Sequence, residues 1–359
     1  MPSPRHSSPL AAYFAAAIGI LIVYACLHPF TGWRDPGLPL FDFLSAPWPR
    51  YYSWVDLVVN VIGIVPFSFA LVSALGRLPR ILAVLLAILL TFSLSLSVET
   101  LQNFLPSRVP SNVDVGCNTI GGILGALAGA RWGGGLFAPS SGLTRWRQRR
   151  IVAGHPGEIG LVLMGLWLLT LLTPESLLFA TGDLRRLFDL PTPLQFNPTR
   201  FVKVEAAIAT SQLLAVGLTA SCMMRRFSPW PLAALVVLGL GAKTLAAAAF
   251  FSPGDPFHWM TPGGQIGLAA GAALLGVCLL LPKRSHGMLA GMALLVGTAL
   301  VNLAPENPFL PSDVELIRHG NFLNFHGLTQ LTASLWPFAA FAYLGLTGPS
   351  VPDDKGRRS

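Results

Sequence analysis

Seven polar side chains with the chemistry of a catalytic or binding site lie in two short stretches of an apolar chain. Carboxylates act as general acids and bases or hold a divalent cation that bridges a diphosphate, and the arginine fork binds phosphate or carboxylate. Side-chain amides can orient a substrate. By type and spacing, the sequence predicts catalytic roles for Glu99, Asp114 and Arg108, and ligand-binding roles for Asp56, Asn60, Gln102 and Asn118.

An internal repeat links the two stretches. The pattern D-x-x-x-N-x-I-G occurs at residues 56–63 and again at residues 114–121. Residues four apart share one face of a helix, and the helix dipole favours an acid in the first turn. Each copy therefore predicts the start of a helix that carries its Asp and its Asn on the same face.

The elements that carry these residues are predicted to be membrane spans. The chain is 53% hydrophobic and only 11% charged, whereas soluble domains carry about 25% charged residues. A span needs about 20 apolar residues. The sequence predicts an all-α bundle of about ten transmembrane helices, near 10–28, 55–75, 81–100, 113–131, 158–179, 204–223, 230–250, 264–282, 288–304 and 328–347.

The distribution of charge predicts the orientation of these spans. With both termini in the cytoplasm, about 15 of the 24 lysines and arginines fall on the inner side, as the positive-inside rule requires. Most acids then fall on the outer side. The expected location is the cytoplasmic (inner) membrane of a bacterium, and cysteine labelling at position 107 should succeed only from outside.

The polar turn between the two repeats predicts a pocket at the outer surface. Glu99, Gln102 and Asn103 share a face at the end of the third span, and Arg108 follows in a loop stiffened by Pro106 and Pro110. A charge beside a span is costly unless it is paired or faces a polar cavity. We therefore expect the seven side chains to meet there. Gly121, Gly125 and Gly129, at intervals of four, predict close approach of the fourth span to a neighbour.

These residues also resemble the VanZ-like family. The D-x-x-x-N motif with a following proline, then E-x-x-Q, P-x-R and D-x-x-x-N-x-x-G occur in order over roughly residues 15–132. The match departs from the family pattern at an insert, Val-Pro-Ser-Asn, between Arg108 and Val113. The resemblance implies a cell-envelope role linked to resistance to the glycopeptide teicoplanin, and it implies no defined reaction or cofactor.

Three roles for the polar set stay open at this point. A binding or transport protein would recognise a lipid-linked glycan or a phospholipid headgroup at the outer leaflet. A hydrolase or transferase would act on a lipid-linked envelope precursor. In a structural protein, Asp56 and Asp114 would cap helices, Glu99 and Arg108 would pair, and the asparagines would join helices.

The rest of the sequence carries weaker signals. The predicted domains are a four-helix unit (1–132), a basic cytoplasmic linker (133–157), a six-helix unit of unknown role (158–347) and a cytoplasmic tail (348–359). Nucleotide-binding motifs are lacking, and neither a metal site nor a nucleic-acid partner is expected. A second outer cluster is predicted in the six-helix unit, where Lys243 would snorkel outward or pair with Glu205 or Glu306. The other members are Arg200, Lys203, Asp255, His258, His319 and His326.

Overall fold

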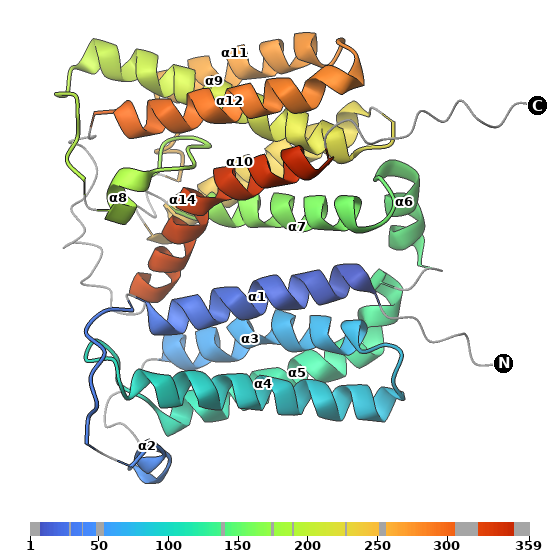
Figure 1. Cartoon of the computed structure of the whole chain (residues 1–359), viewed down its shortest axis with the longest axis vertical. Helices are drawn as coiled ribbons and strands as arrows, with labels where there is room; N and C mark the ends of the chain where they lie inside the picture. The colour runs from blue at the N-terminus through green and yellow to red at the C-terminus, as the bar shows by residue number, and fades with distance from the viewer. Residues whose placement is uncertain are drawn as a thin grey trace, which may run out of the picture. The chain divides into compact units, whose positions relative to one another are not determined.

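Helices are the main secondary structure of the described residues in both halves of the chain (Figure 1). The computed structural model describes residues 8–28, 30–37, 39–47, 54–137, 141–173, 176–188, 190–226, 228–250, 256–305 and 322–347. Within these ranges the only β-type pairing is an isolated bridge between Ile151 and Met224. The prediction of an all-α fold is confirmed for the described residues. The chain divides into two compact units, Met1–Arg149 with Gly320–Leu328, and Arg150–His319 with Thr329–Ser359.

Unit 1, the first of these, is a bundle of long apolar helices with two short ones. The long helices are α1 (Pro9–Leu27), α3 (Trp54–Ala74), α4 (Arg80–Gln102) and α5 (Asn112–Phe137). The short helices are α2 (Asp42–Ser45) and α6 (Gly142–Arg150), whose last residue falls in unit 2. Pro66 lies inside α3, where it removes one backbone hydrogen bond.

The glycine stripe of α5 fits this helix closely against α3. A Cβ atom added at Gly121 or Gly125 would lie within 3.0 Å of the carbonyl oxygen of Val61 or Val65. One added at Gly129 would lie 2.8 Å from the carbonyl oxygen of Phe69. The prediction of close approach is confirmed, and the neighbour is α3. Glycine is needed here because any side chain would push the two backbones apart.

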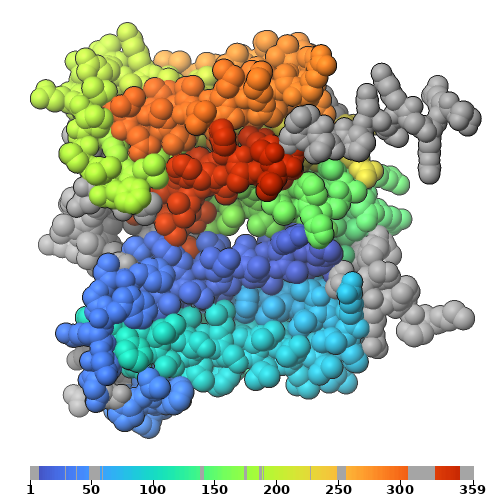
Figure 2. Space-filling model, viewed as in Figure 1, coloured from blue at the N-terminus to red at the C-terminus, as the bar shows by residue number. Residues whose placement is uncertain are grey.

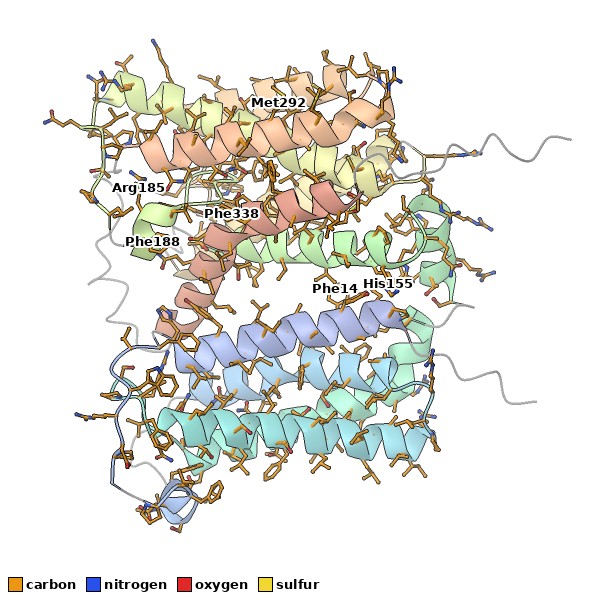
Figure 3. All side chains as sticks on the ribbon, viewed as in Figure 1. Phe14, His155, Arg185, Phe188, Met292 and Phe338 are labelled. Carbon is orange, nitrogen blue, oxygen red and sulfur yellow. The ribbon has the colours of Figure 1, made fainter. Side chains whose placement is uncertain are left out.

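Unit 2 is built around one central helix. It contains α7 (His155–Thr170), α8 (Leu184–Phe188), α9 (Pro198–Met223), α10 (Pro229–Phe250), α11 (Pro262–Cys278), α12 (Lys283–Leu303) and most of α14 (Phe322–Thr347). Helix α9 packs against α7, α10, α11 and α12. Helices α12 (orange) and α14 (red) form much of the visible face of this unit (Figure 2). The exposed side chains of Met292 on α12 and Phe338 on α14 are labelled in Figure 3.

The predicted span 158–179 is wrong in its second half. Helix α7 ends at Thr170, and the described residues from there to Asp183 are not helical. Leu178, Phe179 and Thr181 are nevertheless almost completely buried. Phe179 also has a positive φ of 61°. Irregular backbone in a membrane unit is tolerated where protein surrounds it, and the apolar sequence alone does not distinguish such a segment from a helix.

Six described helices are long and apolar enough to cross a membrane. They are Pro9–Leu27, Arg80–Gln102, Asn112–Phe137, Pro198–Met223, Pro229–Ala248 and Lys283–Leu303. Shorter apolar helices occur at Asn60–Ala74 and Pro262–Cys278. These helices support a multi-pass membrane protein in a lipid bilayer. The count of ten spans and the orientation of the termini stay predictions.

Candidate functional site

Glu99 lies at the end of α4 and stabilises the start of α5. Its Oε2 atom accepts a hydrogen bond of 2.9 Å from the backbone N–H of Ser111. Ser111 is the residue before α5, and its hydroxyl accepts a 3.3 Å hydrogen bond from the backbone N–H of Asp114. This is a capping box whose glutamate comes from a neighbouring helix. Glu99 is 3% exposed, so its carboxylate lies beneath the surface.

Arg108 binds the end of α1. Its Nε donates to the carbonyl oxygen of His28 at 3.0 Å, and its Nη2 donates to the carbonyl oxygens of His28 and, at 3.4 Å, Ala25. The last carbonyls of a helix lack intrahelical partners and carry the negative end of the dipole, which favours a cation. Burial lowers the pKa of the Arg108 guanidinium, while Cys26 and Glu99 raise it. Arginine nevertheless stays protonated in proteins.

Gln102 binds the same helix end. Its Nε2 donates to the carbonyl oxygen of Cys26 at 3.0 Å. A 2.7 Å hydrogen bond joins the Tyr24 hydroxyl to Nδ1 of His28. The end of α1 is therefore fixed by two side chains from elsewhere in unit 1, Gln102 and Arg108.

The two predicted asparagines join helices. Asn60 on α3 donates to Oδ1 of Asp114 on α5 at 2.7 Å. Asn118 donates to the hydroxyl of Ser95 on α4 at 3.0 Å. Asn60 thereby connects the two copies of the sequence repeat, whereas Asn118 binds a helix outside it. The predicted packing role of these amides is confirmed, and a ligand-binding role in addition is a proposal.

Six of the seven predicted residues thus belong to one polar end of unit 1. This polar end comprises the ends of α1 and α4, the starts of α3 and α5, and the loop between α4 and α5. Glu99 and Gln102 are buried, whereas Asn60, Arg108, Asp114 and Asn118 are half-buried. The polar end therefore combines two buried side chains with a half-buried set that contains a carboxylate, a guanidinium and two amides. For the seventh, Asp56, the structure describes the backbone in α3 and not the side chain.

The donor set of the polar end differs from that of a metal site. Across the described residues, no group of three or more His, Cys, Asp or Glu side chains is arranged to hold a metal ion. The half-exposed residues instead offer both donors and acceptors. Such a mixture suits a hydroxylated, anionic group.

Sequence reasoning missed Ser111 and Ser95. Ser111 has a recognisable signal, because S-x-x-D at residues 111–114 is the pattern of a helix N-cap with an acid in its first turn. Ser95 has no such signal. Its hydroxyl lies about two turns before the end of an apolar helix, and its bond to Asn118 depends on how α4 and α5 are placed.

Lys243 in unit 2 is buried and does not snorkel outward. It is 1% exposed. Its Nζ donates to the carbonyl oxygens of Thr173 and Ser176, both at 2.6 Å, and to the Ser176 hydroxyl at 2.9 Å. The prediction that Lys243 snorkels is wrong because this irregular segment surrounds the ammonium group. Of its two predicted partners, Glu205 and Glu306, the second lies outside the described residues.

Of the remaining predicted residues in unit 2, Glu205 has the most clearly defined contact. It is 3% exposed, and its Oε1 accepts a 2.6 Å hydrogen bond from Thr261, the N-cap of α11. Arg200, Lys203 and His258 are exposed. Asp255 and His319 fall outside the described residues, as does the side chain of His326. The second outer cluster therefore stays a prediction.

An arginine in unit 2 resembles Arg108 in its contacts. Arg185 on α8 (Figure 3) donates to the carbonyl oxygens of Ala304 at 2.6 Å and Val301 at 2.9 Å, at the end of α12. The side chain of Asn302 donates a hydrogen bond to the Gly182 carbonyl oxygen and accepts one from the Leu184 backbone N–H. Both units therefore use an arginine to stabilise the end of a long helix, and sequence reasoning did not single out Arg185.

The first third of the chain matches a known family. Residues 11–132 match the VanZ/LLP1 family model. Among curated proteins, the iron(3+)-hydroxamate import system permease protein FhuB of Salmonella typhimurium is 31% identical over 107 residues. That similarity covers 28% of this chain and 15% of FhuB, so the chain spans only a small part of the length of this relative. No solved structure matches the chain.

The family match and the geometry concern the same residues. The matched range contains α1, α3, α4 and α5 up to Trp132, and all seven predicted site residues lie inside it. Residues 11–132 are therefore a VanZ/LLP1 family domain, and the match does not extend to unit 2.

Proposed function

We propose that the VanZ/LLP1 domain recognises the anionic headgroup of an envelope lipid at the outer face of the bacterial cytoplasmic membrane. A lipid-linked glycan precursor is the favoured class of ligand. The observation that carries the proposal is the polar end of unit 1, where Asn60, Arg108 and Asp114 are half-buried. Two buried side chains fix the helices of this end, because Glu99 binds the N-cap residue of α5 and Gln102 binds the end of α1. Supported polar groups at the end of a membrane bundle can select a headgroup while its lipid tail stays in the bilayer.

The role of Arg108 follows from its contacts. The guanidinium binds the end of α1 through Nε and Nη2, so its charge is held in place rather than mobile. A fixed, half-buried cation attracts an anionic headgroup without paying the entropy of ordering a long side chain. Asn60 and Asp114 would then bind hydroxyl groups beside the anion.

A catalytic version of this proposal favours Asp114 over Glu99. Glu99 is buried and accepts a hydrogen bond from the backbone N–H of Ser111. Asp114 is half-buried, and its Oδ1 accepts a hydrogen bond from the side-chain amide of Asn60. A general acid or base must reach the proton that it transfers. In a hydrolase or transferase of this kind, Asp114 would act directly and Glu99 would position the start of α5.

The binding proposal is tested with undecaprenyl phosphate as the probe and undecaprenol as its neutral analogue. Native mass spectrometry of the purified full chain should show the phosphate bound at least tenfold more tightly, which corresponds to about 1.4 kcal/mol. Arg108→Gln should remove this preference. The matched control is Arg34→Gln, since Arg34 is an exposed arginine whose backbone N–H binds the Phe104 carbonyl oxygen near the polar end.

Three outcomes separate the open roles. Equal binding of the two probes by the wild-type chain would refute headgroup recognition. An Arg108→Gln variant that unfolds at lower temperature yet keeps its preference for the phosphate would leave only a structural role for Arg108. An altered envelope lipid in cells with Asp114→Asn, at normal protein levels and with normal probe binding, would support catalysis.

The orientation in this proposal has its own test. Ser107 is exposed in the loop between α4 and α5, so Ser107→Cys should react with an impermeant maleimide in intact cells. The parent protein, with its four native cysteines, is the control. Labelling of position 107 only after lysis would place the polar end in the cytoplasm and refute an outer-face role.

A further inference from the structure

The end of unit 1 opposite the polar end is strongly basic. The ends of α3 and α5 lie together here, because a Cβ added at Gly133 would meet the hydroxyl of Ser73. Helix α4 begins at the same end, six residues after α3 ends at Ala74. Residues 75–80 and 131–149, which we call the basic end, contain six arginines and no aspartate or glutamate. The arginines are Arg77, Arg80, Arg131, Arg145, Arg147 and Arg149.

Helix α6 is fixed to this end by its first turn. The Ser141 hydroxyl accepts a 2.9 Å hydrogen bond from the Thr144 backbone N–H, and the Thr144 hydroxyl donates to the Leu136 carbonyl oxygen at 3.2 Å. Thr144 is buried. Because this residue faces the end of α5, the side of α6 that carries Leu143 and Trp146 is left uncovered, and these side chains are 51% and 49% exposed.

Exposed tryptophan accompanies the arginines at the end of α5 as well. Trp132 is 59% exposed, and the guanidinium of Arg131 lies 6.0 Å from the centre of its ring. Tryptophan concentrates at the level of the lipid headgroups, and basic helices with exposed apolar side chains lie in that layer. Exposed tryptophan beside arginine is therefore typical of a helix end at the membrane–water interface.

We propose that the basic end of unit 1 is a binding surface for anionic phospholipid headgroups. Arg145 and Arg149 bind lipid phosphates, and Leu143 and Trp146 enter the headgroup layer. Charge selects this ligand, because the two segments of the basic end contain six arginines and no aspartate or glutamate. The bilayer is adjacent because α5 is a candidate span with exposed Leu124 and Leu127.

Native mass spectrometry of the delipidated full chain tests the charge requirement, with phosphatidylglycerol and phosphatidylcholine as probes. The wild-type chain should prefer phosphatidylglycerol. The double variant Arg145→Gln/Arg149→Gln should lose roughly 30-fold in affinity for it, given the usual contribution of two basic residues at an anionic surface. Arg145→Lys/Arg149→Lys should retain most of the affinity, because the charge is kept. Arg34→Gln, near the polar end, is the control and should change nothing.

A fluorescent probe on α6 tests its place in the headgroup layer without changing the arginines. An NBD group at Trp146→Cys should shift to shorter wavelength in vesicles when phosphatidylglycerol is added to phosphatidylcholine. The same group at Gln148→Cys should shift less, because position 148 lies on the opposite side of the helix. Both variants need a background with the four native cysteines replaced by serine.

These measurements can overturn the proposal in two ways. Equal affinity for the two lipids in the wild-type chain would remove the charge selection. Identical NBD emission at position 146 with and without phosphatidylglycerol would take α6 out of the headgroup layer, and this result stands even where the glutamine variant fails to fold.

Discussion

The two units pack a glycine-bearing helix on a neighbour in the same way. Helix α5 lies on α3 and α11 lies on α9, with a glycine every fourth residue facing the neighbouring backbone. The pairs are Gly121, Gly125 and Gly129 with Val61, Val65 and Phe69, and Gly263, Gly267 and Gly271 with Val202, Ala206 and Thr210. The starts of α5 and α11 are also alike. Each follows an N-cap residue with a hydroxyl side chain, and this residue donates a hydrogen bond to a glutamate that is 3% exposed.

The difference between the pairs lies in how the glutamate is used. Glu99 comes from α4 and accepts the backbone N–H of Ser111, which any residue except proline would supply. Glu205 comes from α9 and accepts the side-chain hydroxyl of Thr261. The packing arrangement is therefore shared, whereas the half-exposed Asn60 and Asp114 belong to unit 1. Close helix packing alone does not indicate a function, and the polar groups at its end distinguish the two units.

The largest effect that we predict is from added methyl groups in the stripes. Gly121→Ala and Gly267→Ala place a Cβ within 3.0 Å of backbone atoms, and overpacking against backbone should cost about 3 kcal/mol or more, the upper end of the usual range. Thermal unfolding in detergent should show a large loss in both. Gly63→Ala and Gly276→Ala, where nothing lies within 4 Å, should be neutral or stabilising. Tolerance of alanine at position 121 or 267 would show that the two glycine stripes do not pack alike.

A smaller effect is predicted at the two caps, and it should differ between them. Ser111→Ala removes the acceptor for the Asp114 N–H and should cost about 1 kcal/mol. Thr261→Val removes the corresponding acceptor for Gly264 and also leaves Glu205 without its hydroxyl partner. Its total cost should be about 2 kcal/mol, because a buried acceptor without a partner adds at least about 1 kcal/mol. Thr261→Ser should restore stability, and equal losses at both caps would refute the difference in glutamate use.

Glu99→Gln should change stability by less than about 1 kcal/mol, since the amide oxygen can still accept the Ser111 N–H. The measurement is the unfolding temperature together with probe binding. Retained stability with lost binding or activity would show that the charge of Glu99 matters beyond capping. Glu205→Gln is the matched control in unit 2, and there binding at the polar end should stay unchanged.

The sequence predicted the contacts in unit 1 that depend on helical spacing. Gly121, Gly125 and Gly129 share a face whatever the neighbour is, so close packing could be predicted, although the identity of α3 as the neighbour could not. Asn60 and Asp114 were expected at the same end from the repeat. Their direct bond depends on the relative position of two helices, which spacing within one helix does not determine.

The predictions that failed concern irregular backbone. The residues after Thr170 are as apolar as a span, and hydropathy does not report where a helix ends inside a protein. Lys243 was expected to reach water or to pair with Glu205 or Glu306, because a sequence shows the cost of burying an ammonium group and not the carbonyl oxygens of Thr173 and Ser176 that offset it. The contacts of Arg108 with the end of α1 could not be predicted for the same reason, since that helix end is remote in sequence.

The smallest predicted effect concerns the hydrogen bond between Asn118 and Ser95. Asn118 occupies in the second repeat the place of Asn60 in the first, yet it binds α4 rather than α3. Hydrogen bonds between membrane helices contribute about 0.6 kcal/mol on average. A double-mutant cycle of Asn118→Ala and Ser95→Ala should therefore give a coupling of about this size in thermal unfolding. A coupling of zero would show that Asn118 does not stabilise the bundle through Ser95, and a ligand-binding role would then account better for its place in the repeat.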